Sequence, residues 1–456
     1  FRFVNAHGAV HFVKFHRKPR LGRHALYADE ARQIAGCDPD FHRRDLWEAI
    51  ALGQFPEWEL GMQLVGEDKA AALGVDLLDA TKLLPEELVP VLPVGRLVLN
   101  RNPDNYFAET EQSAFHPGHL VPGIDFSSDP LLQGRLFAYS DAQVARLGGP
   151  NHHELPINRS LCPMHNFMRD GAHRMGIARG AVNYEPNSLG NGMEFRVDGG
   201  QHGFQPVPET FEPPKTRRRS PDFDDHFSQA TLFWNSQPSA EKDEIVSAFQ
   251  YELSRVESAA VRQRMVDNLA HVDLRLARKV AEPLGIGAPD PRAAAGQAGF
   301  RDRRGSATLE AAPSLAADQT PTAANLAIAT RKVAILVANG VEVGAMKVLQ
   351  QALHEHGAVT RVVAAQLGVV TTSSGQQLTV DHPLSTMPSV MFDAVMVPGG
   401  AASTELLSQH GEALRFVQEA YRHGKALCLI GESERLLRLP GPPAPGIVRG
   451  PNDPAA

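Results

Sequence analysis

The stretch DPLLQGRLFAYSDAQVARLGGPN, residues 129–151, places one tyrosine between two arginines on a predicted helix. Arg135 precedes Tyr139 by four residues and Arg146 follows it by seven, so all three lie on one face with Gln143 between them. A phenol ordinarily keeps its proton at neutral pH, but an adjacent guanidinium stabilises the phenolate. A phenolate suits ferric iron, and the second cation could pair with a carboxylate. The spacing indicates such a site, against the alternative of a surface tyrosine stacked on arginine.

The ends of this helix can be predicted from its flanking residues. Asp129 is a good N-cap and Pro130 fits the first helical position. The Gly-Gly-Pro sequence at 148–150 ends the helix. We expect the face opposite Tyr139 to pack through three leucines, Leu132, Leu136 and Leu147.

Length and composition limit the classes of protein. A chain of 456 residues predicts two or three domains, and 43% hydrophobic with 21% charged residues excludes global disorder. A net charge of −7 argues against a nucleic-acid partner, and no apolar run is long enough to cross a membrane. Three scattered cysteines, Cys37, Cys162 and Cys428, favour a reducing, cytoplasmic location over a disulfide framework.

The first half of the chain mixes strands, short helices and irregular segments. Residues 1–18 predict a hairpin with a turn at 5–8, and a strand this early suggests that upstream sequence is missing. Further strands are expected after Pro56 and in VPVLPVGRLVLNR, whose prolines indicate a sheet edge. Residues 101–128 and 148–236 lack periodicity, which is typical of functional chain or of chain that wraps a partner.

The second half begins with two predicted amphipathic helices within 239–282. Ser239 is expected to cap the first, and the second carries apolar residues from Val261 and Met265 to Val280 before Pro283 stops it. An Ala/Gly/Pro-rich linker follows. From Lys332, buried strands alternate with helices, which predicts a parallel α/β sheet with its VPGG and LIGES turns at strand carboxyl ends.

The tyrosine segment resembles that of a known family. RLFAY, preceded by NRNPDNYFAETEQSAFHPGHLVPGIDFSSDPLLQG and followed by RLGGPNHHELPIN, is similar to the proximal haem segment of haem catalases. FHPGHLVPG and the terminal α/β domain resemble the large-subunit branch, with a DJ-1/PfpI-like end domain. The resemblance implies an α+β catalase fold, with half of an antiparallel β-barrel, a wrapping loop and a helical domain, plus a C-terminal flavodoxin-like α/β domain.

The resemblance also implies boundaries. We expect barrel strands in 1–100, the wrapping segment with the proximal helix in 101–236, helices in 237–286, a linker in 287–330 and the end domain, truncated and non-catalytic, in 331–456. In the DJ-1/PfpI-like group a cysteine occupies a tight strand-to-helix turn. Ile430 stands at that position here, and Cys428 lies earlier, inside the strand.

The family's site residues can be carried over one at a time. Tyr139 resembles the proximal iron ligand, and catalases are the standard example of haem bound through tyrosine. Arg135 resembles the arginine that bonds the phenolate, and Arg146 a partner of a haem propionate. His116 stands where some large-subunit catalases link a histidine to the tyrosine Cβ. Phe115 and Leu131 are expected to line the haem, of b or d type.

The implied activity is the conversion of hydrogen peroxide to water and oxygen by a homotetramer. The distal histidine and asparagine of the family are expected upstream of this chain, so the chain alone should be inactive. The alternative is a catalase-derived scaffold with a chaperone-like end domain.

Three other sites are disfavoured by the residues. His116 and His119 flank Pro-Gly rather than a helical turn, and no cysteine or acid stands at zinc spacing. VPGGA lacks the dinucleotide glycine pattern. The KTRRRS run at 215–220 is most simply a solvated or inter-subunit contact.

Overall fold

The structure is a computed structural model that is described here for most of the chain. The described residues are 1–73, 76–149, 151–161, 169–174, 176–177, 180, 207–208, 225–287, 289, 309–319, 328–437 and 446–450. Cys162 and the KTRRRS run, both considered above, lie outside these residues. No helix among the described residues is long and apolar enough to cross a bilayer.

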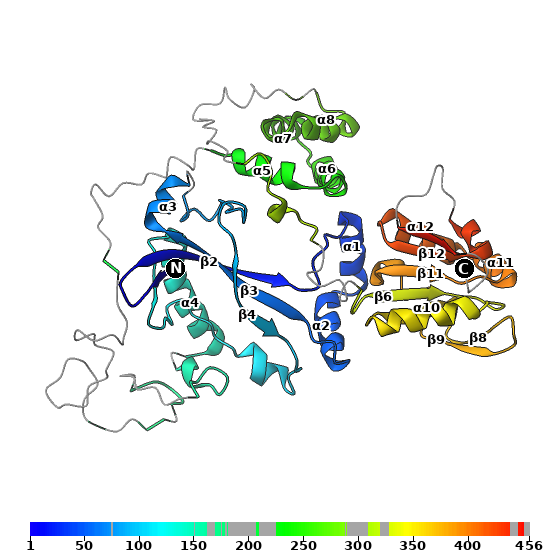
Figure 1. The fold of residues 1–456 in the computed structure, drawn as a ribbon, viewed down its shortest axis with the longest axis horizontal. Helices are drawn as coiled ribbons and strands as arrows, with labels where there is room; N and C mark the ends of the chain where they lie inside the picture. The colour runs from blue at the N-terminus through cyan, green and yellow to red at the C-terminus, as the bar shows by residue number, and fades with distance from the viewer. Residues whose placement is uncertain are drawn as a thin grey trace.

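The first part of the chain builds a five-stranded antiparallel sheet in the order β4-β3-β2-β1-β5 (Figure 1). Its hairpin joins β1 (Arg2–Val4) to β2 (Val10–Pro19) with Phe3 opposite His11, as the sequence predicts. The later strands are β3 (Glu57–Gly66), β4 (Leu92–Val98) and β5 (Ile124–Asp125). β4 is an edge strand, which confirms the expectation from its prolines.

A buried glutamine anchors the chain beyond β3 to this sheet. Gln63 is fully buried, yet its polar atoms are satisfied. Its amide donates to the carbonyls of Leu84 at 3.2 Å and Val89 at 2.6 Å, and its Oε1 lies 2.8 Å from His16 Nε2. Because an unsatisfied buried amide is costly, these bonds fix the path of the connection after β3.

Two helices connect β2 to β3 and lie between the five-stranded sheet and the terminal domain (Figure 1). They are α1 (Ala28–Cys37) and α2 (Phe41–Ala51), and the left-handed Gly53, with φ of 76°, follows the second. The short helix α3 (Glu67–Ala72) follows β3. After β4 come a π-helical turn, η1 (Phe107–Glu111), the long helix α4 (Pro130–Leu147) and the turn η2 (His152–Glu154).

The helical part departs from the sequence expectation in two ways. It contains α5 (Ser228–Ser236), α6 (Ser239–Ser254), α7 (Ala259–Val272) and α8 (Leu274–Ala281). Ser239 is the first residue of α6 rather than its cap, since Pro238 holds the cap position and makes no side-chain bond. The second predicted helix is in fact two helices, because Asp273 leaves the helical conformation and accepts the Arg275 and Leu276 amides to cap α8.

The break changes which apolar residues reach the core. Val266, Leu269, Leu276 and Val280 are buried together with Trp234 and Leu253. Val261 and Met265, expected in the same core, are 41% and 38% exposed.

The described part of the connection after α8 is packed against both neighbouring regions. Residues 309–319 contain the turn η5 (Pro313–Leu315). The hydroxyl of Ser314 donates to Glu87 at 2.6 Å, and Asn235 of α5 donates to the Glu310 carbonyl at 3.1 Å. This stretch therefore ties the helical part to the connection between β3 and β4.

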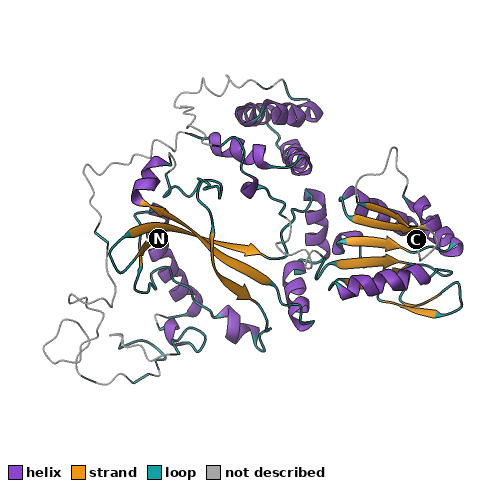
Figure 2. Ribbon diagram, viewed as in Figure 1, coloured by secondary structure: helices purple, strands orange, loops and turns teal. Residues whose placement is uncertain are grey.

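The C-terminal domain has a six-stranded parallel sheet in the order β10-β7-β6-β11-β12-β13, as predicted (Figure 2). The strands are β6 (Lys332–Leu336), β7 (Val359–Ala364), β10 (His382–Pro383), β11 (Ala394–Val397), β12 (Ala426–Ile430) and β13 (Ile447–Gly450). The predicted Gly-rich hairpin is β8 (Gly368–Thr371) and β9 (Gln377–Val380). The helical elements are α10 (Gly344–Glu355), η7 (Ser389–Met391), α11 (Ala401–Ser408), α12 (Gly411–Arg422) and η8 (Gly431–Leu436).

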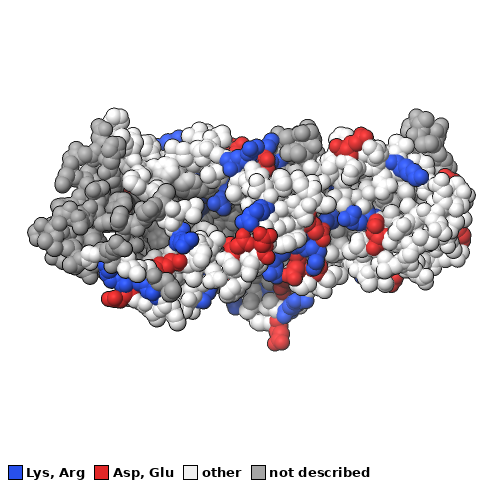
Figure 3. Space-filling view, turned by 90° about the horizontal axis from the view of Figure 1, so that it is seen from below, with Lys and Arg blue, Asp and Glu red and all other residues white. Residues whose placement is uncertain are grey.

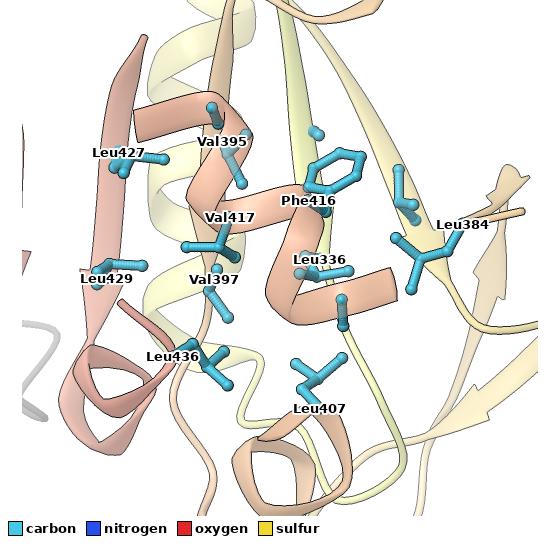
Figure 4. Packing of buried hydrophobic residues seen from close by; sticks show 14 of the residues in the cluster. Leu336, Leu384, Val395, Val397, Leu407, Phe416, Val417, Leu427, Leu429 and Leu436 are labelled. Atoms are coloured by element: carbon cyan, nitrogen blue, oxygen red, sulfur yellow. The ribbon is translucent and has the colours of Figure 1, made fainter. Parts of the chain in front are cut away.

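Buried apolar residues hold this domain together. Leu336, Val397 and Leu427 of the strands meet Phe416 and Val417 of α12 (Figure 4). Each of these side chains is at most 3% exposed. At about 25 cal/mol per Å² of apolar area, such burial is the main stabilising contribution to the domain.

Candidate functional site around Tyr139

Helix α4 is held at both ends by the residues that the sequence singled out. The Asp129 carboxylate accepts the Leu131 amide at 2.8 Å, and Pro130 occupies the first helical position. At the other end Gly148 has a φ of 79°, and its amide donates to the Val144 carbonyl at 3.0 Å. These caps fix the length of the helix and so the position of Tyr139 on it.

The packing face of α4 is not where we expected it. Leu132 and Gln143 are buried, while Leu136 and Leu147 are half-buried. Tyr139, also half-buried, stands in the same stripe, since these positions recur at intervals of three or four residues. The three leucines thus lie on the same face as Tyr139 instead of opposite it. The face through which the helix packs therefore also holds the Tyr139 side chain in position.

Tyr139 has a cationic partner in the described structure. The Nη2 of Arg135 donates to the phenol oxygen of Tyr139 at 3.2 Å, and the guanidinium carbon lies 5.2 Å from the ring centre. The arginine is exposed and the tyrosine is half-buried. The phenol oxygen thus has a hydrogen-bond donor that carries a positive charge.

Arg146 is turned towards backbone carbonyls. Its guanidinium donates to the Glu111 carbonyl, to the Ser113 carbonyl at 2.6 Å and to Gln143 Oε1 at 2.8 Å. Gln143 in turn donates to the Phe115 carbonyl at 3.2 Å. These bonds fasten the segment before His116 onto α4.

His116 lies beside Tyr139 with a defined orientation. The ring centroids are 6.5 Å apart and the ring planes meet at 80°. The Gly118 amide donates to His116 Nδ1 at 2.8 Å, so the neutral ring carries its hydrogen on Nε2, which lies 2.8 Å from Ser140 Oγ. A Cβ at position 118 would lie 2.8 Å from this ring, so a side chain there would displace the ring from its present position.

Further histidines surround His116 without forming a metal cluster. His119 stacks on it with centroids 4.9 Å apart. Burial, followed by the charges of His116, His152 and His153, lowers the pKa of His119, which favours its neutral form at pH 7. Among the described residues, no group of three or more histidine, cysteine or acidic side chains is placed to hold a metal ion.

Large apolar side chains near Tyr139 are exposed on the described chain. Phe115 is 77% exposed and Leu131, on α4, is 57% exposed. A tyrosine oxygen with a guanidinium donor suits a ferric haem centre, and exposed apolar side chains on the same helix and on the segment that leads to His116 could cover a planar apolar group. The donor set and its surroundings therefore fit a haem.

Sequence reasoning missed two residues of this arrangement. Ser140 and Gly118 hold the His116 ring, and neither was singled out. The adjacency of Ser140 to Tyr139 and the His-Pro-Gly turn before Gly118 were the available signals.

The turn after β12 in the end domain contains a glycine with a left-handed backbone conformation. Ile430, the predicted thiol position, has an ordinary φ of −106°, whereas Gly431 has a φ of 61°. Cys428 is part of β12, and burial raises the pKa of its thiol. The Ser433 hydroxyl lies within hydrogen-bonding distance of the Val397 and Ile430 carbonyls, at 3.0 and 2.9 Å. No thiol stands on this described turn.

Comparison with known families covers most of the chain. Residues 1–191 match the catalase family, and residues 220–284 match the catalase-related immune-responsive family. Residues 329–455 match the C-terminal domain found in long catalases.

Similar proteins occur in bacteria and fungi. The chain is 48% identical over 435 residues to catalase HPII of Pseudomonas putida, covering 95% of this chain and 60% of that protein. It is 46% identical to catalase-2 of Bacillus subtilis over 438 residues, 96% of this chain and 61% of the relative. It is 43% identical to catalase-1 of Neurospora crassa over 437 residues, 96% of this chain and 57% of the relative. The chain thus spans about 60% of the length of these curated relatives.

Proposed function

The chain belongs to the haem catalases, in the long group with an extra C-terminal domain, and on this basis we propose that the whole protein converts hydrogen peroxide to water and oxygen. The observation that carries the proposal is the hydrogen bond from Arg135 to the phenol oxygen of Tyr139 on a capped helix. Haem, when bound, supplies the iron that exchanges electrons with peroxide. We propose a haem of b or d type.

The residues of this chain have the following proposed roles. Tyr139 binds the iron as phenolate, and Arg135 stabilises the negative charge on that oxygen. Phe115 and Leu131 cover the haem, which excludes water from the iron ligand. Arg146 assists a propionate, although its bonds to Glu111, Ser113 and Gln143 occupy most of its donors.

His116 orients the Tyr139 side chain through an edge-to-face contact between the two rings. Its place at 6.5 Å from the Tyr139 ring, and its bonds to Gly118 and Ser140, support this role. A covalent bond between this ring and the tyrosine Cβ stays a prediction.

We assign proton transfer between the peroxide oxygens to a distal histidine, and the orientation of peroxide to a distal asparagine. The family resemblance alone supports these two roles, and neither is assigned to a residue of this chain. We propose that residues 1–456 by themselves lack catalase activity. A non-enzymatic scaffold is the weaker proposal, because the relatives named above, which match 95–96% of this chain, are catalases.

Tyr139→Phe in the full-length protein tests the assignment. Removal of the oxygen should abolish the absorption bands of a phenolate-bound ferric haem together with oxygen release from peroxide. Tyr106→Phe is the matched control, because Tyr106 is 52% exposed and precedes the same helix. An unchanged haem spectrum and rate in Tyr139→Phe would refute the role of Tyr139.

A further inference from the structure

The C-terminal domain contacts the rest of the chain through helices α1 and α2. Both helices lie between the two sheets (Figure 1), and acidic and basic side chains gather over this middle region in the space-filling view (Figure 3). We call the contact between these helices and the C-terminal domain the seam. Its polar contacts can be followed one group at a time.

The most buried contact of the seam is an ion pair. Lys425, in the turn between α12 and β12, lies 2.7 Å from Glu30 in the first turn of α1. The two side chains are only 8% and 5% exposed. Lys425 also donates to the Ser389 and Val390 carbonyls at 3.1 and 3.2 Å, so its charge is fully coordinated.

The neighbouring acid of α1 meets two more basic side chains. Asp29 lies 2.9 Å from Arg422 and 3.3 Å from the buried ring of His423. Tyr27 stacks on that ring, with centroids 6.5 Å apart and an interplanar angle of 28°. Gly424 closes the turn with a φ of 67°, and a Cβ there would lie 3.3 Å from the Tyr27 hydroxyl.

Acidic side chains of the second helix, α2, likewise pair with a basic residue of the C-terminal domain. Lys332, at the start of β6, lies 3.4 Å from Asp45 and 3.2 Å from Glu48 of α2. Nearby, the Gln54 amide donates to the Gly357 carbonyl at 2.9 Å. Beside these contacts the seam encloses a cavity of about 190 Å³, lined in part by Phe41 of α2 and Phe392 of the C-terminal domain.

Acidic and basic side chains therefore lie on opposite sides of the seam. In every ion pair found between the described parts of α1 or α2 and the C-terminal domain, the helix supplies the acid and the domain supplies the base. The acids of α1 also lie at the positive end of its helix dipole, which holds them in place. The contacts named here are mostly polar, and a polar interface between domains is the kind at which domains can move relative to each other.

We propose that α1 and α2 form an acidic docking surface for the basic edge of the chain's own C-terminal domain, and that this domain attaches reversibly through those charges. The Glu30–Lys425 pair is the centre of the surface, because it alone is almost completely removed from water. Loss of one partner leaves the other charge buried and unpaired. The more exposed pairs of Asp29, Asp45 and Glu48 contribute less and steer the approach.

A double-mutant cycle in the full-length protein tests the proposal. Hydrogen exchange, followed by mass spectrometry on peptides from α1 and from the turn between α12 and β12, measures how often the seam opens. Glu30→Gln should raise exchange in both peptides by about 100-fold, because it leaves Lys425 without its counter-charge. Glu30→Gln with Lys425→Met should raise it by clearly less than the product of the two single effects, because no buried charge remains unpaired.

Two controls separate docking from folding. Lys347→Met removes an exposed lysine of α10 in the same domain and should leave seam exchange unchanged. Peptides of β11, in the centre of the sheet, report whether each variant keeps its domain folded. The proposal is overturned if the two substitutions multiply as independent effects. It is also overturned if Glu30→Gln leaves seam exchange at the wild-type rate, or if β11 loses protection together with the seam.

Discussion

At the scale of single residues, the chemistry rests on one oxygen and the cation beside it. Arg135 is held near Tyr139 only by its own flexible side chain, which is exposed on the described chain, whereas Tyr139 belongs to the packing stripe of α4. The fold thus positions the tyrosine, and we expect the arginine to act through its hydrogen bond to the phenol oxygen. The two residues should respond differently to substitution.

Arg135→Leu should leave haem bound but lower the rate of oxygen release by about 10- to 100-fold. The substitution removes a partner of the proposed ligand and not the ligand itself, and losses of this kind are typically of that size. In the full-length protein, the haem absorption spectrum shows whether haem is still bound. The steady-state rate of oxygen release shows whether turnover falls. Arg96→Leu, at another exposed arginine, serves as the control. A normal rate in Arg135→Leu would leave that residue a structural role only.

At the scale of elements, periodicity and capping residues predicted most helices and strands but not their packing. The hairpin, α4 and the parallel sheet were predicted because their signals are local. The break at Asp273 was missed because the apolar period continues across it, while a single carboxylate ends one helix and caps the next. The stripe of Leu132 and Tyr139 could not be assigned from sequence, because a helix shows which residues share a face but not which face is covered.

The first turn of α1 gives the seam a dependence on pH. Burial by itself raises the pKa of Asp29, but the hydrogen bond and charge of His423, with the charge of Arg422, outweigh it and hold that pKa below its ordinary value of 3.8. A carboxyl with a lowered pKa stabilises the folded state fully above its ordinary pKa and loses this effect as the pH falls through the lowered one. The charged and titratable groups at this end of α1 are Tyr27, Glu30, Glu244, Arg422, His423 and Lys425.

Asp29→Asn should therefore destabilise the protein near neutral pH and cease to do so in acid. The difference between wild-type and variant urea midpoints, measured from pH 7 down to below pH 3.8, checks this. A difference that stays constant over the whole range would show that the Asp29 charge has no part in stability. Asp243→Asn, at an exposed acid of α6 paired with Lys279, is the matched control.

At the scale of the whole molecule, several large apolar side chains of the described residues are strongly exposed to solvent. Phe107 is 65% exposed, Leu161 is 98% exposed and Ile177 is 90% exposed. All three belong to the segments at 101–128 and 148–236, whose sequence is typical of functional chain or of chain that wraps a partner. Such surfaces are typical of chain that is covered in an assembly.

We therefore expect the full-length protein to be a homotetramer. Light scattering coupled to size-exclusion chromatography should give a mass near four subunits. Ile177→Asp, at one of these surfaces, should lower the mass. A monomer at working concentration would contradict the expectation.

The bonds of Arg146 bear on the order in which the protein is assembled. Glu111, Ser113 and Gln143 accept this guanidinium through contacts made entirely within the chain. The segment that leads to His116 is thus already fastened to the helix of Tyr139. This side of the haem site would be ordered before haem binds. The conformational entropy of ordering it would therefore be lost during folding and not during haem binding. Slow steps of maturation should then belong to the opposite side of the haem.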